Sequence, residues 1–451
     1  MIQTPMRIQI LVMAALLAFA PSVGAQSDTA TTSRARRDSV AKAVRDSIAL
    51  MKELGGALAA PNDSSAGAAP SAGAGGPTGS QTGPTNPRLL PDFSAVGDLV
   101  ADLSPKGSTQ PGGERFGVRE VELAVQAVVD PYFRGDVFLG ISDAEGVSIE
   151  QAYLTSTSLP NQLEARLGRF LMPFGKQNTT HRHDLHTIEY PYVIQRFLSD
   201  DALKGTGVWG SRVFSPFGFY QEVQITAVDR LGSRANGLTT EVPVNKSLGG
   251  LGYSARLRNY VDVSEAANFE LSFSALTGRR ERALDPAYVA QLDSGVNAAV
   301  ARQTTLGADL TYRWRPLQQG LYRSFILQSE VMHQLNERNP DVPVRASCLA
   351  CQNAGVAAFT TAARDFTGAY VFARYQTGQR TFIGSRYDWL QDPDADGRTL
   401  NAGSVYLEWF PSEFSKLVAG YEAVSPSGGT LVNRLLLQAS FSLGPHKPHP
   451  F

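Results

Sequence analysis

From residue 89 onward, the chain divides into segments in which apolar and polar residues alternate. In 303–314, Leu306 and Ala308 alternate with Gly307 and Asp309. A period of two places the two sets of side chains on opposite faces of a β-strand. Sixteen such strands are predicted: 90–103, 115–129, 132–142, 148–158, 163–172, 205–214, 219–229, 249–262, 268–277, 303–314, 323–335, 367–376, 380–390, 402–410, 416–424 and 430–443.

The connections between these predicted strands alternate in length. Short connections include 130–131, 159–162, 215–218 and 377–379, and long ones include 173–204, 230–248, 278–302 and 336–366. In a meander barrel with both chain ends on one side, short turns face the periplasm and long loops face outside. A soluble β-sandwich gives no reason for this segregation. We therefore predict an all-β fold, a transmembrane antiparallel meander β-barrel of about 16 strands over residues 89–444.

The last predicted strand, 430–443, agrees with a barrel. Leu435, Leu437 and Phe441 share an apolar face, and the opposite face carries small and polar residues. Such barrels usually end in an amphipathic strand with an aromatic residue nearby, and Phe451 lies close behind this strand. Residues 445–451 are predicted to form a short periplasmic tail.

The first 25 residues have the pattern of an export signal. An apolar stretch, 8–20, follows Arg7, and small residues at 23–25 provide a cleavage site. The stretch is well short of the roughly 20 residues that a membrane-spanning helix needs, so an anchor is the weaker alternative. We predict a signal peptide over 1–25 and, for the barrel, the outer membrane of a Gram-negative type of cell, with both chain ends in the periplasm.

Two segments of different character precede the barrel. Residues 26–55 contain apolar positions at helical spacing, which predicts a short periplasmic helix. Because so short a helix is marginal alone, it is expected to form a coiled coil with its own copies, and a solvated helix is the alternative. Residues 56–88 are rich in Gly, Ala, Ser, Pro and Thr, which predicts a disordered linker.

A barrel of sixteen strands has a lumen that side chains alone do not fill. The connection 173–204 carries too many apolar residues for a free surface loop, so we predict that it folds inward and constricts the pore. Its basic and imidazole side chains are candidates for the constriction: Lys176, His181, Arg182, His183 and Arg196.

The strand faces predicted to line the lumen carry charges of both signs. The candidates are Arg166, Arg212, Arg256, Arg258, Arg313, Arg374 and Arg386, with Glu222, Asp309, Glu330 and Glu408. This mixed lining predicts a polar channel and leaves open whether anions or cations are preferred. The formal net charge of the chain is −1, which gives no indication of a nucleic-acid partner.

The segment 163–178, LEARLGRFLMPFGKQN, runs from a Gly-Arg-Phe strand into Pro-Phe-Gly and a polar loop. It resembles the phosphate-selective porin (O and P) family and related trimeric outer-membrane porins. The resemblance implies a trimeric diffusion channel that in some members binds anions through arginines and lysines in its lumen. Some relatives also carry a periplasmic N-terminal coiled coil.

Smaller groups of residues are assigned more modest roles. His181, His183 and His186 could bind zinc or copper with His446 and His449, but the topology puts the two groups on opposite sides of the membrane. We therefore predict polar pore or surface histidines and no metal site. The sequence DPDADG at 392–397 matches the opening of a calcium loop but lacks its closing Glu, so it is interpreted as a solvated turn, with a weak extracellular calcium contact as the alternative.

Cys348 and Cys351 are the two cysteines of the chain, and both lie in the predicted loop 336–366. In an oxidising compartment, a local disulfide that pins this loop is the preferred interpretation, ahead of a redox site. The spacing of Ser, His and acidic residues does not form a catalytic set, so neither an enzyme nor a cofactor is predicted.

The sequence thus predicts an outer-membrane porin for passive diffusion and no enzymatic activity. Its partners would be outer-membrane lipid, two further copies of the chain in a homotrimer, and small hydrophilic solutes or ions that diffuse through. The alternative is a structural or adhesive barrel that tethers the outer membrane to the cell wall through residues 26–88.

Overall fold

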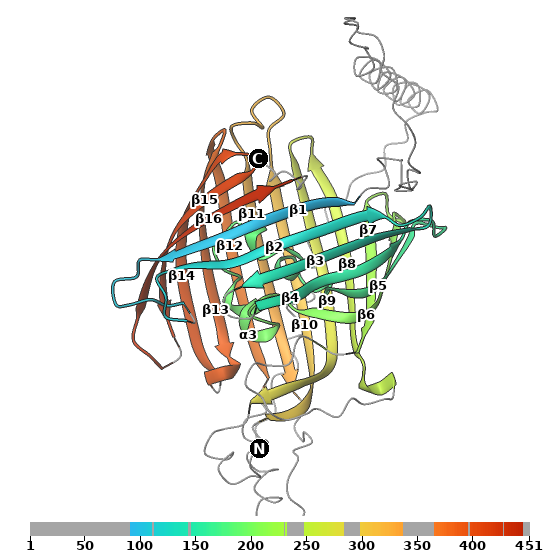
Figure 1. Ribbon diagram of the computed structural model, residues 1–451, viewed down its shortest axis with the longest axis horizontal. Helices are drawn as coiled ribbons and strands as arrows, with labels where there is room; N and C mark the ends of the chain where they lie inside the picture. Colours follow the sequence, from blue (N-terminus) through green and yellow to red (C-terminus); the bar gives the residue numbers. More distant parts are fainter. Residues whose placement is uncertain are drawn as a thin grey trace, which may run out of the picture. The chain divides into compact units, whose positions relative to one another are not determined.

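The described part of the chain is a closed β-barrel (Figure 1). The computed structural model describes residues 91–444 except for 111, 143–145, 230, 232–247, 284–297, 337–364, 396 and 427. The chain separates into two units, 1–81 and 82–451, and all described residues belong to the second. The predicted signal peptide, helix, linker and C-terminal tail lie outside the described residues.

All sixteen predicted strands are confirmed. They are β1 (Asp92–Asp102), β2 (Phe116–Val128), β3 (Phe133–Ser142), β4 (Gly146–Ser156), β5 (Leu163–Leu171), β6 (Lys204–Phe214), β7 (Tyr220–Val228), β8 (Gly252–Ser264), β9 (Ala267–Ala283), β10 (Ala298–Trp314), β11 (Phe325–Asn336), β12 (Phe366–Gly378), β13 (Thr381–Asp392), β14 (Arg398–Ser412), β15 (Ser415–Ser425) and β16 (Val432–Leu443). Strands β9 and β10 extend beyond their predicted ends, because they pair in register as far as Ala298 and Ala283. The charged residues there resemble a loop in sequence.

Each strand pairs antiparallel with the next, and the first pairs with the last. The β1–β16 seam runs from Ala95 opposite Leu443 to Asp102 opposite Leu436. Closure leaves no strand edge with unpaired backbone groups, which is a requirement inside lipid. Connections after even-numbered strands are short, such as 379–380, and several after odd-numbered strands are long, such as 172–203.

The two faces of the barrel wall differ as the alternation predicts. On β14, Val405 and Leu407 are 54% and 50% exposed on the outer face, whereas Glu408 is fully buried on the inner face. On β10, Leu306 is exposed outward, and Asp309 is buried inward. An apolar outer face with a polar inner face is the arrangement of a barrel surrounded by lipid. Within the described residues, no helix is long and apolar enough to cross a membrane.

Candidate functional site: the barrel interior

The connection between β5 and β6, residues 172–203, lies inside the barrel, and we name it the infolded segment. It contains the one-turn helices η2 (Gln177–Thr179) and η3 (Arg182–Asp184) and the short helix α3 (Tyr192–Phe197). Helix α3 contacts β11, β12 and β13 from within the ring of strands (Figure 1). The predicted inward fold of this connection therefore places protein across part of the lumen.

A buried asparagine holds the two ends of the infolded segment together. The Asn178 side-chain amide donates to the carbonyl oxygens of Met172, at 2.9 Å, and Leu203, at 3.1 Å. The Leu203 amide in turn donates to Asn178 Oδ1 at 2.6 Å. Because both ends are fixed at one point of the wall, the segment forms a loop that enters the lumen and returns to the same place.

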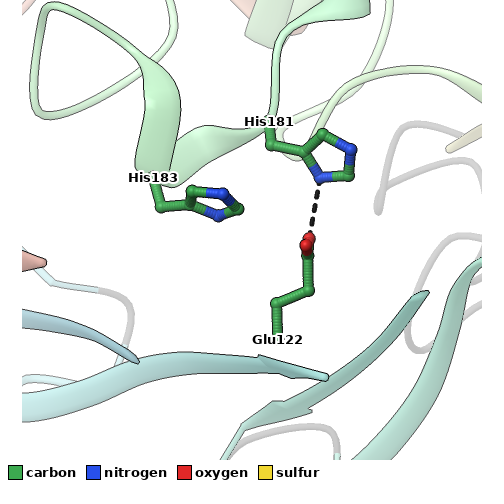
Figure 2. A group of neighbouring side chains, drawn as sticks. All are labelled: Glu122, His181 and His183. Atoms are coloured by element: carbon green, nitrogen blue, oxygen red, sulfur yellow. Dashed lines mark ion pairs between the residues drawn. The ribbon is translucent and has the colours of Figure 1, made fainter. Parts of the chain in front are cut away.

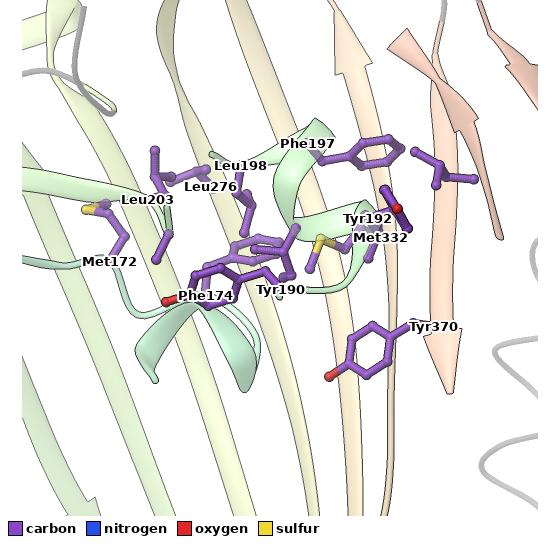
Figure 3. Close-up of a cluster of buried hydrophobic side chains, with 14 of the residues drawn as sticks. Met172, Phe174, Tyr190, Tyr192, Phe197, Leu198, Leu203, Leu276, Met332 and Tyr370 are labelled. Atoms are coloured by element: carbon purple, nitrogen blue, oxygen red, sulfur yellow. The ribbon is translucent and has the colours of Figure 1, made fainter. Parts of the chain in front are cut away.

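Apolar side chains pack the infolded segment against the wall. Figure 3 shows Phe197 and Leu198 of the segment in one cluster with Met332 of β11 and Tyr370 of β12. Each fully buried side chain of this size stabilises the packed state by roughly 1.5–3 kcal/mol. The predicted surplus of apolar residues in this connection is thus accounted for by its contact with the wall.

Two wall glycines provide the space for this packing. A Cβ at Gly307 would lie 2.8 Å from Cζ of Phe174, and a Cβ at Gly368 would lie 2.7 Å from Cγ2 of Val193. Both glycines are on inward-facing positions of their strands. They allow the aromatic ring and the valine methyl group to rest directly on the backbone of the wall.

Buried carboxylates of the wall bind backbone amides of the infolded segment. Glu330 Oε1 accepts hydrogen bonds from the amides of Lys176, at 3.0 Å, and Gln177, at 2.8 Å. Asp388 Oδ1 accepts from the amide of Tyr192, at the start of α3, at 3.0 Å. A negative charge is favoured at this position, because the first amides of a helix lack partners in the helix itself.

Cations of the wall bind the carbonyl oxygens of the same segment. Arg386 donates to the Glu189 carbonyl oxygen at 2.7 Å. Lys416, which is 2% exposed, donates to the carbonyl oxygens of His183 and, at 2.8 Å, Leu185. These contacts satisfy buried cations and buried carbonyl groups together, which otherwise would each destabilise the fold.

The opposite side of the interior is open. A cavity of about 1090 Å³ is bounded by the inner faces of β2–β8 and by the first part of the infolded segment. Its charged lining has five carboxylates and five arginine or lysine side chains: Glu122, Asp136, Glu164, Asp184, Glu222, Arg134, Arg166, Lys176, Arg256 and Arg258. The cavity is therefore polar and close to charge-balanced.

Several of the cations that line the cavity converge on Glu270 of β9. Glu270 pairs with Lys176 at 2.8 Å and with Arg258 at 3.2 Å. Arg258 also pairs with Glu222 at 2.8 Å, and Arg256 pairs with Asp309 at 3.1 Å. Such pairing weakens the field that each cation projects into the cavity.

One arginine of the cavity wall is stacked on aromatic rings. The Arg166 guanidinium carbon lies 4.4 Å from the ring centre of Trp209 and 5.2 Å from that of Tyr153. Its charge is also paired with Glu164 at 2.8 Å. Sequence reasoning named Arg166 but not the two aromatic residues, although both lie on strands whose faces are assigned by alternation.

The structure separates the five predicted constriction residues into two groups. Lys176, His181 and His183 line the cavity. Arg182 pairs with Asp201 at 3.2 Å within the infolded segment, and Arg196 lies 3.9 Å from Asp392 at the end of β13. The first three are therefore the ones that face the cavity.

The predicted lumen-wall residues face inward, with one exception. Arg374 and Glu408 form a buried pair joined by two 2.8 Å hydrogen bonds. The prediction for Arg212 is wrong, because Arg212 is exposed and alternates with Ser211 and Val213, which line the cavity. Its neighbours in β6 are small residues that give no strong apolar face, so the sequence did not define which side of the strand is inward.

Ionisable groups of the infolded segment are tuned by their surroundings. Burial lowers the pKa of His181, but the hydrogen bond and negative charge of Glu122 raise it, and the net pKa shift is upward. Burial is the leading cause of the lowered pKa of His183. Burial alone would raise the pKa of Asp201, but the charges of Arg182 and Lys204 bring it down to about 2.

The remaining sequence predictions concern residues that lie wholly or partly outside the described ones. Cys348 and Cys351, with their predicted disulfide, lie outside the described residues, as do His446 and His449. The turn at 392–397 is described only in part. Its residues Pro393–Ala395 form the one-turn helix η5.

Comparison with known proteins gives one relative by sequence. An uncharacterized protein of Aquifex aeolicus (strain VF5) is 26% identical over 395 residues, which cover 80% of this chain and 79% of the relative. No family model matches the chain.

Solved structures with similar folds are outer-membrane barrels. A loop L8 deletion mutant of OmpT, an outer membrane protein of Vibrio cholerae, has a TM-score of 0.50 at 10% identity and covers 79% of this chain and 100% of its own. An anion-selective porin from Comamonas acidovorans has a TM-score of 0.49 at 10% identity, over 78% of this chain and 99% of its own. The likeness to the OmpT mutant is one of fold: this chain has the barrel fold of a protein of the outer membrane.

Proposed function

We propose that this protein is an outer-membrane porin through which small hydrophilic solutes or ions diffuse passively. The observation that carries the proposal is the polar cavity of about 1090 Å³ inside a closed barrel whose outer face is apolar. A charged, water-accessible lining removes the free-energy cost that a hydrophilic solute would meet in lipid. Diffusion then requires neither a cofactor nor a bound partner.

The infolded segment is proposed to be the constriction. It packs on the inner faces of β11–β13 and leaves the cavity beside β2–β8. Lys176, His181 and His183 stand where the segment borders that cavity, so they would set its limits of size and charge. With five carboxylates against five arginines and lysines, the lining supports weak rather than strong ion selectivity.

The assembly and the solute class are proposed from the resemblance of 163–178 to trimeric porins. That stretch forms β5 and the first turn of the infolded segment. We propose a homotrimer in outer-membrane lipid with both chain ends in the periplasm. Membership of the phosphate-selective porin family stays a prediction. Chemical cross-linking would test the trimer. Competition by phosphate against the chloride conductance would test the preference for phosphate.

The experiment that tests the function is planar-bilayer recording of the purified mature protein. We expect stepwise increases in conductance and, in a salt gradient, a reversal potential close to zero. Absence of conductance steps from correctly folded protein would overturn the proposal. A variant without residues 26–88 should conduct like the full chain. Absence of conductance from the full chain, together with loss of cell-envelope cohesion in cells that carry the shortened variant, would favour the tether.

A further inference from the structure

Three side chains that could bind a metal ion meet at the edge of the cavity. Glu122 comes from β2, and His181 and His183 come from the infolded segment, on either side of the start of η3. One ligand atom of each residue lies within 4.8 Å of those of the other two. Figure 2 shows the Glu122 carboxylate reaching toward the two imidazole rings, with the His181–Glu122 ion pair marked.

We propose that Glu122, His181 and His183 bind one divalent transition-metal ion, of which Zn²⁺ is the natural probe. Two imidazole nitrogens and a carboxylate oxygen are a donor set that zinc accepts in a tetrahedral geometry, with water as the fourth ligand. Copper(II) and nickel(II) also suit imidazole, whereas calcium and magnesium prefer sites built from oxygen ligands. The metal proposal is independent of solute diffusion.

The distances suit replacement of a proton by a metal ion. His181 Nδ1 lies 2.7 Å from Glu122 Oε2, so the two atoms share a hydrogen. Metal–ligand bonds of roughly 2.0–2.1 Å in a tetrahedron place neighbouring ligand atoms roughly 3.3 Å apart. Glu122 and His181 would therefore separate slightly, and His183 would move toward them by a rotation of its ring.

The surroundings of the three residues support binding. The side chains of Glu122 and His183 are 6% and 4% exposed, which holds their positions, yet both also line the cavity and so can be reached by a hydrated ion. Asp184 Oδ2 lies 3.7 Å from His183 Nε2 and adds a second negative charge beside the site. Two carboxylates thus balance the charge of a divalent cation.

Gln151 of β4 fixes the ring of His181 from the far side. Its side-chain amide lies 2.8 Å from His181 Nε2. The Gln151 oxygen accepts from the Leu171 backbone amide at 3.1 Å, which fixes the position of the Gln151 side chain. Metal binding at Nδ1 would move the ring proton to Nε2, and Gln151 would have to give up the Leu171 hydrogen bond for its oxygen to accept that proton. Neighbours of this kind orient the ring of a metal-binding histidine.

This inference departs from the sequence prediction of no metal site. That prediction paired His181 and His183 with histidines near the end of the chain. The carboxylate ligand instead comes from β2, where Glu122 is one of several inward-facing residues and has no sequence feature that links it to the histidines. Because the ligands join wall and segment, a bound metal ion would clamp the segment to β2.

The test is zinc binding by the purified full-length mature protein after removal of metals with a chelator. Equilibrium dialysis should give one tightly bound Zn²⁺ per chain. Glu122→Gln and His183→Ala should each weaken binding at least tenfold, and His186→Ala should leave it unchanged. Cobalt(II) in place of zinc should give the intense visible absorption of a tetrahedral site, and this absorption should be lost in Glu122→Gln.

Two results would overturn the proposal: no stoichiometric zinc binding by the wild type, or equal affinity in the wild type, Glu122→Gln and His183→Ala. Folding of each variant is checked by the heat-dependent mobility of the barrel on gels. If His183→Ala does not fold, His181→Asn and Glu122→Gln carry the same test. A His446→Ala/His449→Ala variant that retains the site supports the assignment, whereas loss of binding there would assign the zinc to the tail.

Discussion

The two sides of the barrel interior are made from the same alternating strands but end in different environments. On the open side, the side chains of Arg166 and Arg258 are 32% and 28% exposed and face the cavity. On the covered side, those of Arg374 and Arg386 are 3% and 1% exposed. The alternation of apolar and polar residues alone assigns all four arginines to the lumen. Arg386 is buried because the infolded segment lies on it, through Thr187 and Glu189. Arg374 is buried by wall residues, against Glu408 and the ring of Phe382.

The comparison shows that an inward-facing charge can serve two different purposes. Beneath the segment, Arg386 and Lys416 bind peptide carbonyl groups and so fix protein to protein. Beside the cavity, Arg258 is held by Glu222 and Glu270 and still borders water. An inward-facing charge can therefore act on a diffusing ion only where no protein segment covers it.

The largest expected effect comes from removing most of the infolded segment. In a variant with residues 179–201 replaced by a short Gly-Ser linker, Asn178 still joins the two ends. The covered side then opens to water, and single-channel conductance should rise several-fold, because sixteen strands enclose a wide lumen. The replaced residues carry two arginines and four carboxylates, a net charge of −2, so the reversal potential should also shift toward anion preference.

Heat-dependent gel mobility is the control that this shortened barrel has folded. Unchanged conductance in the folded variant would contradict the segment's role as the constriction and would place the narrowest point elsewhere. A conductance increase without any shift in the reversal potential would separate the two effects: the segment would limit size but not charge.

The next prediction compares one arginine from each side. Arg386→Met leaves the buried carboxylate of Asp388, 2.7 Å from the lost guanidinium, without its cation, whereas Glu422 keeps Arg434 at 2.8 Å. Removing one partner of a buried pair typically lowers the free energy of unfolding by about 3–5 kcal/mol. Arg166→Met, on the open side, breaks a partly exposed pair and should lower it by less than about 1 kcal/mol.

Urea unfolding of the barrel in lipid vesicles, followed by tryptophan fluorescence, measures both variants. Trp209 stacks on Arg166, so circular dichroism serves as the second signal for that variant. Similar losses of stability for the two substitutions would contradict the difference in environment between the two sides.

A smaller effect tests the packing that holds the cover in place. In Gly307→Ala, the new methyl group would lie 2.8 Å from the ring of Phe174, so the ring must move. Overpacking of this kind lowers the free energy of unfolding by about 1–3 kcal/mol. Gly403→Ala is the matched control, because Gly403 is exposed and has nothing within 4 Å of the added carbon. Equal stability of the two variants would show that Phe174 is not confined.

The sequence predicted the wall better than the contents of the barrel, for a physical reason. Each strand face meets a uniform environment, lipid or interior, so a period of two identifies all sixteen strands. The infolded segment was recognisable because its apolar side chains need a partner surface. Where the neighbouring residues in a strand are small, as beside Arg212, alternation does not show which face of the strand is inward. The prediction that Arg212 lines the lumen was therefore wrong.

Pairings across the interior depend on distances that the chain order does not encode. Lys416 binds the carbonyl oxygen of Leu185, which is 231 residues away in sequence, and Glu122 meets His181 only because the segment folds back toward β2. Charge type alone gives many possible partners for each residue. The assignment of a lumen charge to the open or covered side therefore requires the path of the segment.

The smallest expected effect concerns Asp201, where the infolded segment rejoins the wall. The charges of Arg182 and Lys204 hold the pKa of Asp201 at about 2, below its ordinary value of 3.8. A lowered folded-state pKa stabilises the fold at pH values above the ordinary one, and this contribution is lost as the pH falls through about 2. Since the Asp201 side chain is 43% exposed, solvent screening limits the contribution to about 1 kcal/mol or less.

Asp201→Asn should therefore unfold more easily than the wild type at pH 7, and the difference should vanish as the pH is lowered from about 4 to about 2. Asp200→Asn is the matched control, since Arg182 contacts the backbone carbonyl of Asp200. A difference that persists unchanged at low pH would mean that Asp201 acts through its shape rather than its charge. The place where the infolded segment rejoins the wall would then be held by packing, as on the covered side of the barrel, and not by the ion pairs of Asp201.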